Sequence, residues 1–135
     1  MFRMKAVAAI LGGVLVAAGC ATMGSAPVRF SGGVLVNSTG MTLYTFDKDP
    51  AGSGKSVCID KCAAIWPPLK ATAEDKPRGD YTIITRNDGS RQWAYKGKPL
   101  HLWIKDRKPG DETGDGFNKL WHVVKEAPPL MWSGY

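Results

Sequence analysis

Short apolar runs separated by turn-forming residues predict β-structure in the first half of the chain. Val34–Val36 and Thr42–Phe46 are rich in β-branched and aromatic residues, and residues 37–40 between them read Asn-Ser-Thr-Gly. Two such runs joined by four turn-forming residues predict a β-hairpin. Because side chains alternate along a strand, Tyr44 and Phe46 are expected on one face.

A polar loop and a short helix are expected to follow this hairpin. Residues 47–55 are rich in Gly, Ser and Lys, which indicates a loop. Residues 59–66 are the best candidate for a helix, because Asp60 stands near the start and Pro67 would stop it.

The second half repeats the alternation of strands and turns. Residues 70–80 are charged and contain Pro and Gly, which indicates a linker. Beyond it we expect strands at Tyr81–Arg86, Arg91–Tyr95, Leu100–Lys105 and Leu120–Lys125, with a polar loop over residues 106–117.

An internal repeat relates the two halves. In each copy a Gly is followed by Leu, a ring, a second ring and an Asp at the same spacing, and the two copies are offset by 57 residues. The matching pairs are Gly40 and Gly97, Tyr44 and His101, Phe46 and Trp103, and Asp49 and Asp106. Such self-similarity indicates two copies of one structural unit.

These patterns predict a mainly β fold. We expect one small domain at residues 31–126, built from two hairpin-based pseudo-repeats (31–70 and 81–126), with one short helix near a pair of cysteines. The 16 Gly and 9 Pro residues favour such a turn-rich β protein. Residues 127–135 form an apolar tail broken by prolines, which we expect to lie across the core surface.

The start of the chain has the features of an export signal. A basic segment precedes the 13-residue apolar run Ala6–Ala18, which is too short to span a bilayer. The run ends in Val-Ala-Ala-Gly before Cys20, which resembles the lipobox of bacterial lipoproteins, although Leu is commoner where Ala17 stands. We therefore expect a signal peptide at residues 1–19, lipidation of Cys20 and a flexible tether at residues 20–30. An ordinary signal peptide cut near Ala21 is the alternative.

The mature chain is expected to be a small, exported protein. Removing residues 1–19 from 135 leaves 116 residues, with 16 Lys plus Arg against 12 Asp plus Glu, a net charge of +4. These charges are scattered and mixed in sign, which argues against a nucleic-acid partner. The residue after Cys20 is Ala rather than Asp, which by resemblance to other lipoproteins implies the outer membrane, facing the periplasm.

The repeats resemble a known family. Tyr44, Phe46 and Asp49 fit the Tyr-x-(Phe/Trp/Tyr)-x-x-Asp motif of a secreted bacterial lipoprotein repeat of unknown function. Further similar segments are Cys58-x-x-x-Cys62-Ala63 with Trp66-Pro67-Pro68-Leu69, Gly97-x-Pro99-Leu100, Gly110–Gly116, and Trp121-His122-Val123-Val124. His101 replaces the motif Tyr in the second copy. The resemblance implies an exported two-repeat protein, with no settled activity.

Cys58 and Cys62 allow two interpretations. A structural disulfide is feasible, because residues four apart on a helix or tight loop bring their Cα atoms near the disulfide limit. The alternative is a thiolate pair that binds copper or carries electrons, with His101, His122, Met41 or Met131 as further ligands. The oxidising compartment and the even number of cysteines left after Cys20 favour the disulfide.

The motif residues also allow two interpretations. The rings could form a ligand platform, but we expect core packing, with the polar tips hydrogen-bonded and each Asp capping a loop. The acidic residues in the second loop could bind calcium, but tight turns need the same residue types. These acidic residues are Asp106, Asp111, Glu112 and Asp115.

No catalytic set is recognisable in the sequence, which lacks nucleophile-elbow, zinc-protease, phosphate-loop and dinucleotide motifs. We therefore expect a non-catalytic envelope lipoprotein, without a cofactor, that is held to the membrane by its lipid. It would bind an envelope protein or stabilise an envelope assembly. A periplasmic copper-binding or electron-transfer accessory is the alternative function.

Overall fold

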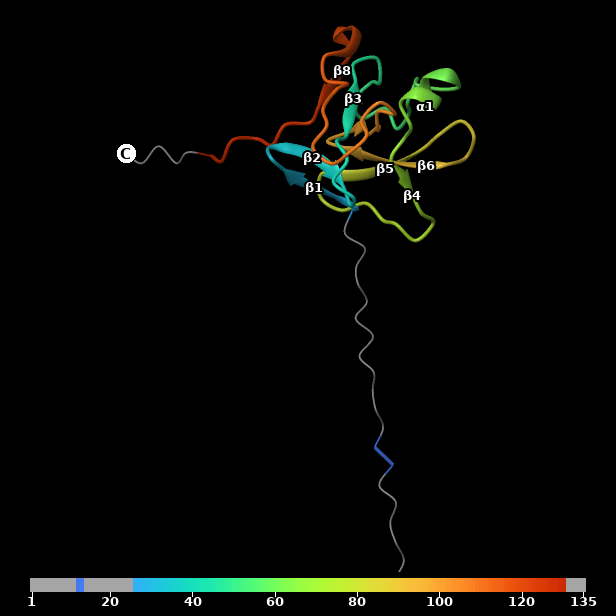
Figure 1. Ribbon diagram of the computed structural model, residues 1–135. Helices are drawn as coiled ribbons and strands as arrows, with labels where there is room; N and C mark the ends of the chain where they lie inside the picture. Colours follow the sequence, from blue (N-terminus) through green and yellow to red (C-terminus); the bar gives the residue numbers. More distant parts are fainter. Residues whose placement is uncertain (1–11, 14–25, 131–135) are drawn as a thin grey trace, which may run out of the picture.

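The computed structural model describes residues 12–13 and 26–130 (Figure 1). Cys20, nearly all of the expected signal peptide and the first part of the expected tether lie outside these residues, as does Met131. Within the described ranges, no helix has the length and hydropathy that crossing a bilayer requires.

The described chain is mainly β, with one short α-helix and one 3-10 helix. The strands are β1 (Val28–Ser31), β2 (Val34–Asn37), β3 (Tyr44–Phe46), β4 (Lys70–Ala71), β5 (Tyr81–Thr85), β6 (Arg91–Tyr95), β7 (Lys98–Pro99) and β8 (Trp121–Val123). The helices are α1 (Lys61–Ile65) and the 3-10 helix η1 (Phe117–Lys119). The expected helix, β5, β6 and β8 are therefore present, with shorter bounds for the helix and β8.

The strands form three small antiparallel sheets. β1 pairs with β2, β3 pairs with β8, and β6 lies between β4 and β5 with β7 also paired to it. The β3–β8 pair joins the first repeat to the end of the second, so the repeats do not fold as separate units.

Matching backbone hydrogen bonds relate the two repeats. Leu43 N donates to Leu35 O, and Leu100 N donates to Trp93 O, both at 2.9 Å. Between the repeats, Tyr44 N donates to His101 O at 2.8 Å and His101 N donates to Tyr44 O at 2.9 Å. Because Tyr44 and His101 are equivalent positions, this reciprocal pair lies on an approximate two-fold axis.

The expected strand over Leu100–Lys105 does not form. Only His101 in this segment makes ladder bridges, to Tyr44 and to Pro68. The segment facing it contains Pro67 and Pro68, which have no N–H to donate, so a continuous ladder cannot develop. The equivalent β8 lacks proline and does pair as a strand with β3.

The expected tether is wrong at its C-terminal end, because β1 starts at Val28. Val28 and Phe30 are partly buried against the core, and the glycines at 32 and 33 turn the chain into β2 with positive φ values of 59° and 85°. β2 therefore pairs mainly with β1. The hairpin expected between residues 34–36 and 42–46 is reduced to one bridge, Val36 to Thr42.

The linker and the tail also differ from expectation. The first two residues of the expected linker at 70–80 form β4. Residues 127–130 form no helix or strand and run away from the domain (Figure 1), and Leu130 is 99% exposed. The described part of the tail therefore does not lie across the core.

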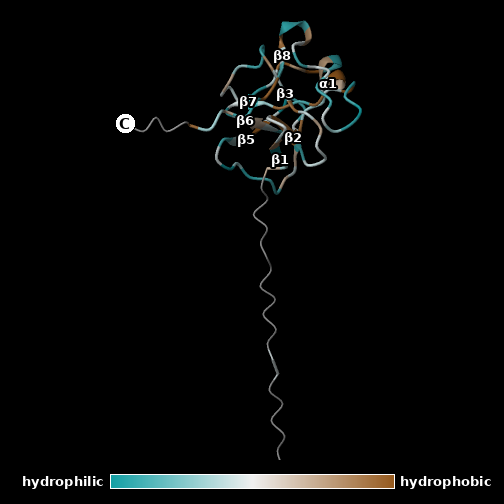
Figure 2. Cartoon of the chain, turned by 60° about the vertical axis from the view of Figure 1, so that its left-hand side comes forward, coloured by the Kyte–Doolittle hydropathy of each residue, from teal (hydrophilic) through white to brown (hydrophobic). Residues whose placement is uncertain are grey.

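Two hydrophobic clusters form the core. One is aromatic and contains Tyr44, Phe46, Cys58, Trp66, Trp103, Trp121 and Val123. The other contains Ala26, Leu35, Leu43, Leu69, Trp93 and Leu100. Hydrophilic residues colour most of the outer loops, whereas α1 also carries hydrophobic residues (Figure 2).

Candidate functional site

The polar ring of each repeat is hydrogen-bonded to the motif Asp of the other repeat. Tyr44 Oη donates to Asp106 Oδ2 at 2.6 Å, and His101 Nε2 lies 2.9 Å from Asp49 Oδ2. All four side chains are buried. The motif spacing is thus an intramolecular clasp between the repeats, in which each copy supplies one ring and one carboxylate.

Each carboxylate also organises the loop that follows it. Asp49 accepts hydrogen bonds from Ser56 Oγ and from Val57 N at 2.7 Å. Asp106 accepts hydrogen bonds from Thr113 N at 3.0 Å and from Thr113 Oγ1 at 2.6 Å. Ser56 and Thr113 are again 57 residues apart, so both loops close in the same way.

The Tyr44 hydroxyl remains a protonated donor in this setting. Burial, and next the hydrogen bond to Asp106, raise the pKa of Tyr44 far above its ordinary value of 10.0. The Gly114 N–H, which donates to Tyr44 Oη at 3.2 Å, acts in the opposite direction. The phenol therefore supplies a fixed hydrogen bond inside the core.

The remaining motif rings form a column. Trp66 stacks between Trp103 and Trp121, with ring centroids 3.9 Å apart on each side, and Phe46 stacks on Trp121 at 4.3 Å. Only glycine fits beside this column at 114, because a Cβ there would lie 2.7 Å from Trp66 Cη2. All eight motif residues are thus part of the core.

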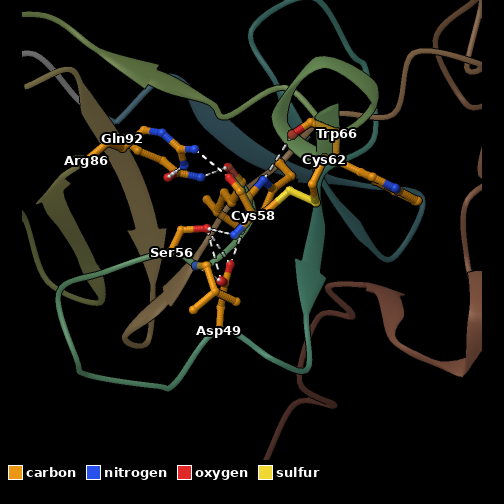
Figure 3. Close-up of a disulfide and its surroundings, with 10 residues drawn as sticks. Asp49, Ser56, Cys58, Cys62, Trp66, Arg86 and Gln92 are labelled. Carbon is orange, nitrogen blue, oxygen red and sulfur yellow. Dashed lines mark hydrogen bonds and ion pairs between the residues drawn. A yellow bond between two sulfur atoms is a disulfide. The ribbon is translucent and has the colours of Figure 1, made fainter. Parts of the chain in front are cut away.

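The two cysteines form a disulfide beside the column (Figure 3). Cys58 and Cys62 are bonded, with their Cα atoms 5.1 Å apart, and Cys58 is fully buried. Arg86 donates to the Cys58 carbonyl, and Trp66 N donates to Cys62 O at 2.7 Å. The disulfide therefore links the first loop to α1 and to Trp66, as the structural interpretation predicts.

The residues proposed as copper ligands are engaged elsewhere. His101 Nδ1 lies 3.1 Å from Trp66 O, and His101 Nε2 bonds to Asp49. His122 Nε2 lies 2.9 Å from Asp47 Oδ2 at the surface. In the part of the chain that the structure describes, no group of three or more His, Cys, Asp or Glu side chains could hold a metal ion.

The acidic residues of the second loop stabilise turns. Asp111 Oδ2 accepts from the backbone N–H groups of Arg107 and Lys108, which lowers the pKa of the Asp111 carboxyl. Asp115 Oδ1 accepts from Val123 N at 3.0 Å. These contacts agree with the turn interpretation of this loop.

Exposed apolar side chains gather around the disulfide and the tryptophan column. Val57 and Ile59 flank Cys58, Ile104 N donates to Ile65 O, and the Phe117 ring packs against Trp66 and Trp103. We call this group the apolar rim; its members, all at least 39% exposed, are Val57, Ile59, Ile65, Ile104 and Phe117. Leu130 is the one other large hydrophobic residue of the described chain that is exposed to this degree.

An open hollow lies next to this rim, between α1 and the β5–β6 turn. Its volume is about 510 Å³, and Ile59, Ala63, Pro67 and Pro68 are among its apolar lining residues. Sequence reasoning missed the rim, because Ile104 and Phe117 are the residue types that a buried position would also carry. It also missed the role of Ser56, Thr113 and Gly114, for which the 57-residue spacing was an available signal.

Comparison with known proteins identifies the repeats. A family model described as a secreted repeat of unknown function matches residues 27–70 and 82–125. The two matched segments cover most of β1 to β4 and of β5 to β8, in agreement with the hydrogen-bond equivalences above. No curated protein and no solved structure gave a significant match.

Proposed function

Since the chain belongs to the family of secreted repeats of unknown function, we propose that it is a lipid-anchored, non-catalytic binding module of the bacterial envelope. Lipidated at Cys20, it sits on the periplasmic side of the outer membrane. The apolar rim is the surface that contacts an envelope protein.

The observation that carries this proposal is that the clasp uses up the chemical groups of the motif. Tyr44, Asp49, His101 and Asp106 are buried and hydrogen-bonded to one another or to their own loops. Groups without access to water or substrate serve to hold the fold rather than to transfer protons. The surface that remains for a task is the apolar rim, and exposed apolar patches mark interaction sites.

Replacing Cys20 with Ser tests the anchor. The variant should move from the membrane fraction to the soluble fraction and should lose the mass of the acyl chains, because several chains on one residue are needed for durable attachment. An unchanged mass and continued membrane attachment would contradict the lipoprotein assignment.

A charge placed on the rim tests the binding surface. Ile104→Asp should abolish crosslinking to an envelope protein from a photoreactive residue at position 117, because the charge would have to be desolvated in the contact. Thr82→Asp is the matched control, since Thr82 is exposed on β5 and lies outside the rim. Crosslinking that survives Ile104→Asp, or fails equally in both variants, would refute the rim as the contact surface.

A further inference from the structure

The N-terminal attachment of the domain fixes how it can face a membrane. Ala26 is buried in the core, and Val28 N donates to Ala26 O at 2.7 Å, so the chain is held to the domain from residue 26 onward. Six residue steps separate Ala26 from Cys20. At about 3.3–3.6 Å a step, these residues span at most about 20 Å.

This distance is short compared with the domain itself. A domain of about 100 residues is roughly 30 Å or more across. In Figures 1 and 2 the start of β1 lies at the end of the domain away from α1 and β8. A lipid on Cys20 therefore holds the β1 end near the bilayer and leaves the α1 end out of its reach.

The surface at the β1 end has the chemistry of a membrane interface. An open hollow of about 380 Å³ lies there, and Val28, Phe30, Tyr81 and Tyr95 line it. The rings are half-buried and contact one another, Phe30 with Tyr95 at 6.0 Å and Tyr81 with Tyr95 at 5.1 Å between centroids. Amphipathic rings of this kind are enriched where headgroups meet acyl chains.

Charged side chains border the same hollow. Arg78 is exposed at its edge, and Lys96 Nζ lies 5.4 Å from the centroid of the Tyr95 ring. Both cations can reach lipid phosphates, while Asp80 is the carboxylate in the same lining.

We propose that this surface, formed by Phe30, Tyr81, Tyr95, Arg78 and Lys96, docks on the headgroup layer of the membrane that holds the lipid anchor. The inference rests on the proposed lipidation of Cys20. Docking there orients the domain, so that the apolar rim faces the periplasm and is presented to a partner.

Site-specific quenching tests this orientation. The full lipidated protein is reconstituted into vesicles of phosphatidylethanolamine and phosphatidylglycerol that contain a headgroup nitroxide lipid. Arg78→Cys and Lys105→Cys each carry one environment-sensitive dye, and each replaces one exposed cation, so their charges match. Lys105 follows Ile104, whose N donates to Ile65 O at the end of α1, so it reports on the far end.

The dye at 78 should be quenched several-fold more than the dye at 105. Equal quenching, or stronger quenching at 105, would overturn the orientation. A second measurement needs no substitution in the surface: amide exchange at residues 78–83 should slow in the vesicle-bound protein relative to the soluble Cys20→Ser chain. Unchanged exchange would also contradict docking.

Mass spectrometry of the same preparation separates the two hypotheses. If the acyl mass is present and the quenching pattern fails, the orientation is wrong and the anchor stands. If the acyl mass is absent, the anchor is refuted and the orientation falls with it.

Discussion

Removing the Tyr44 hydroxyl measures what the clasp contributes to stability. Tyr44→Phe keeps the ring and deletes only Oη, which donates to Asp106 and accepts from the Gly114 N–H. Asp106 keeps its two hydrogen bonds from Thr113, but its Oδ2 atom loses its donor in a buried position.

The expected loss follows from these contacts. A hydrogen bond to a charged group contributes about 1.5–3 kcal/mol. The Gly114 N–H is also left without its partner, which costs a further ~1 kcal/mol. Tyr44→Phe should therefore lower the free energy of unfolding by about 2–4 kcal/mol.

Equilibrium urea unfolding of the mature Cys20→Ser chain, with its disulfide intact, measures this loss. Tyr81→Phe is the matched control, because it deletes the same atom from a half-buried ring outside the clasp and should cost under about 0.5 kcal/mol. In an Asp106→Ala background, Tyr44→Phe should cost less than about 1 kcal/mol, because the bond it removes is already gone. Equal costs in both backgrounds, or a Tyr44→Phe loss no larger than that of Tyr81→Phe, would refute the clasp.

Three further predictions concern the same core. Because the pKa of Tyr44 is raised in the folded state, its contribution to stability is complete below the ordinary value of 10.0 and is lost as the pH rises above it. Urea titrations above pH 10 should show a loss of up to about 1.4 kcal/mol per pH unit, which is smaller in Tyr44→Phe. Replacing Cys58 and Cys62 with Ser should lower the free energy of unfolding by about 2 kcal/mol, and native alkylation of the parent protein should find no free thiol at either position. Gly114→Ala should cost about 1–3 kcal/mol in the same assay and weaken the near-ultraviolet dichroism, because its methyl group would overlap the Trp66 ring.

The elements that local patterns predict are those that local residues determine. The alternation in residues 81–95 and the turn between the two runs predict β5 and β6, because both strands are continuous and pair with each other. The spacing of Cys58 and Cys62 predicts the disulfide for a similar reason. The geometry of a four-residue separation depends little on the rest of the chain.

The clasp could not be predicted in the same way. A spacing of 57 residues is the same whether two repeats lie side by side or interlock, so it reveals equivalence and not contact. The fate of residues 100–105 likewise depends on Pro67 and Pro68, which lie far away in the sequence and face this segment only in the folded protein. β1 was missed because its four residues gain their stability from packing against the second hydrophobic cluster.

The departure from the motif at His101 has a physical reason that can be tested. Its two ring nitrogens face two groups that only accept, the Trp66 carbonyl at 3.1 Å and the Asp49 carboxylate at 2.9 Å. Both nitrogens must therefore donate, or Asp49 must carry the shared proton. A tyrosine has a single polar atom at its tip, so it could not bond to both groups.

Two amide substitutions separate the two hydrogen bonds of His101. Asn places a donor near the Nδ1 position and preserves the bond to Trp66, whereas Gln reaches toward the Nε2 position and preserves the bond to Asp49. A buried carboxylate that loses a donor costs more than a carbonyl that loses one, about 1.5–3 against about 0.5–1.5 kcal/mol. His101→Gln should therefore be the more stable variant in urea unfolding, by about 1 kcal/mol. If His101→Asn is equally or more stable, Asp49 does not depend on the ring of the other repeat. The clasp would then be held by Tyr44 and Asp106 alone.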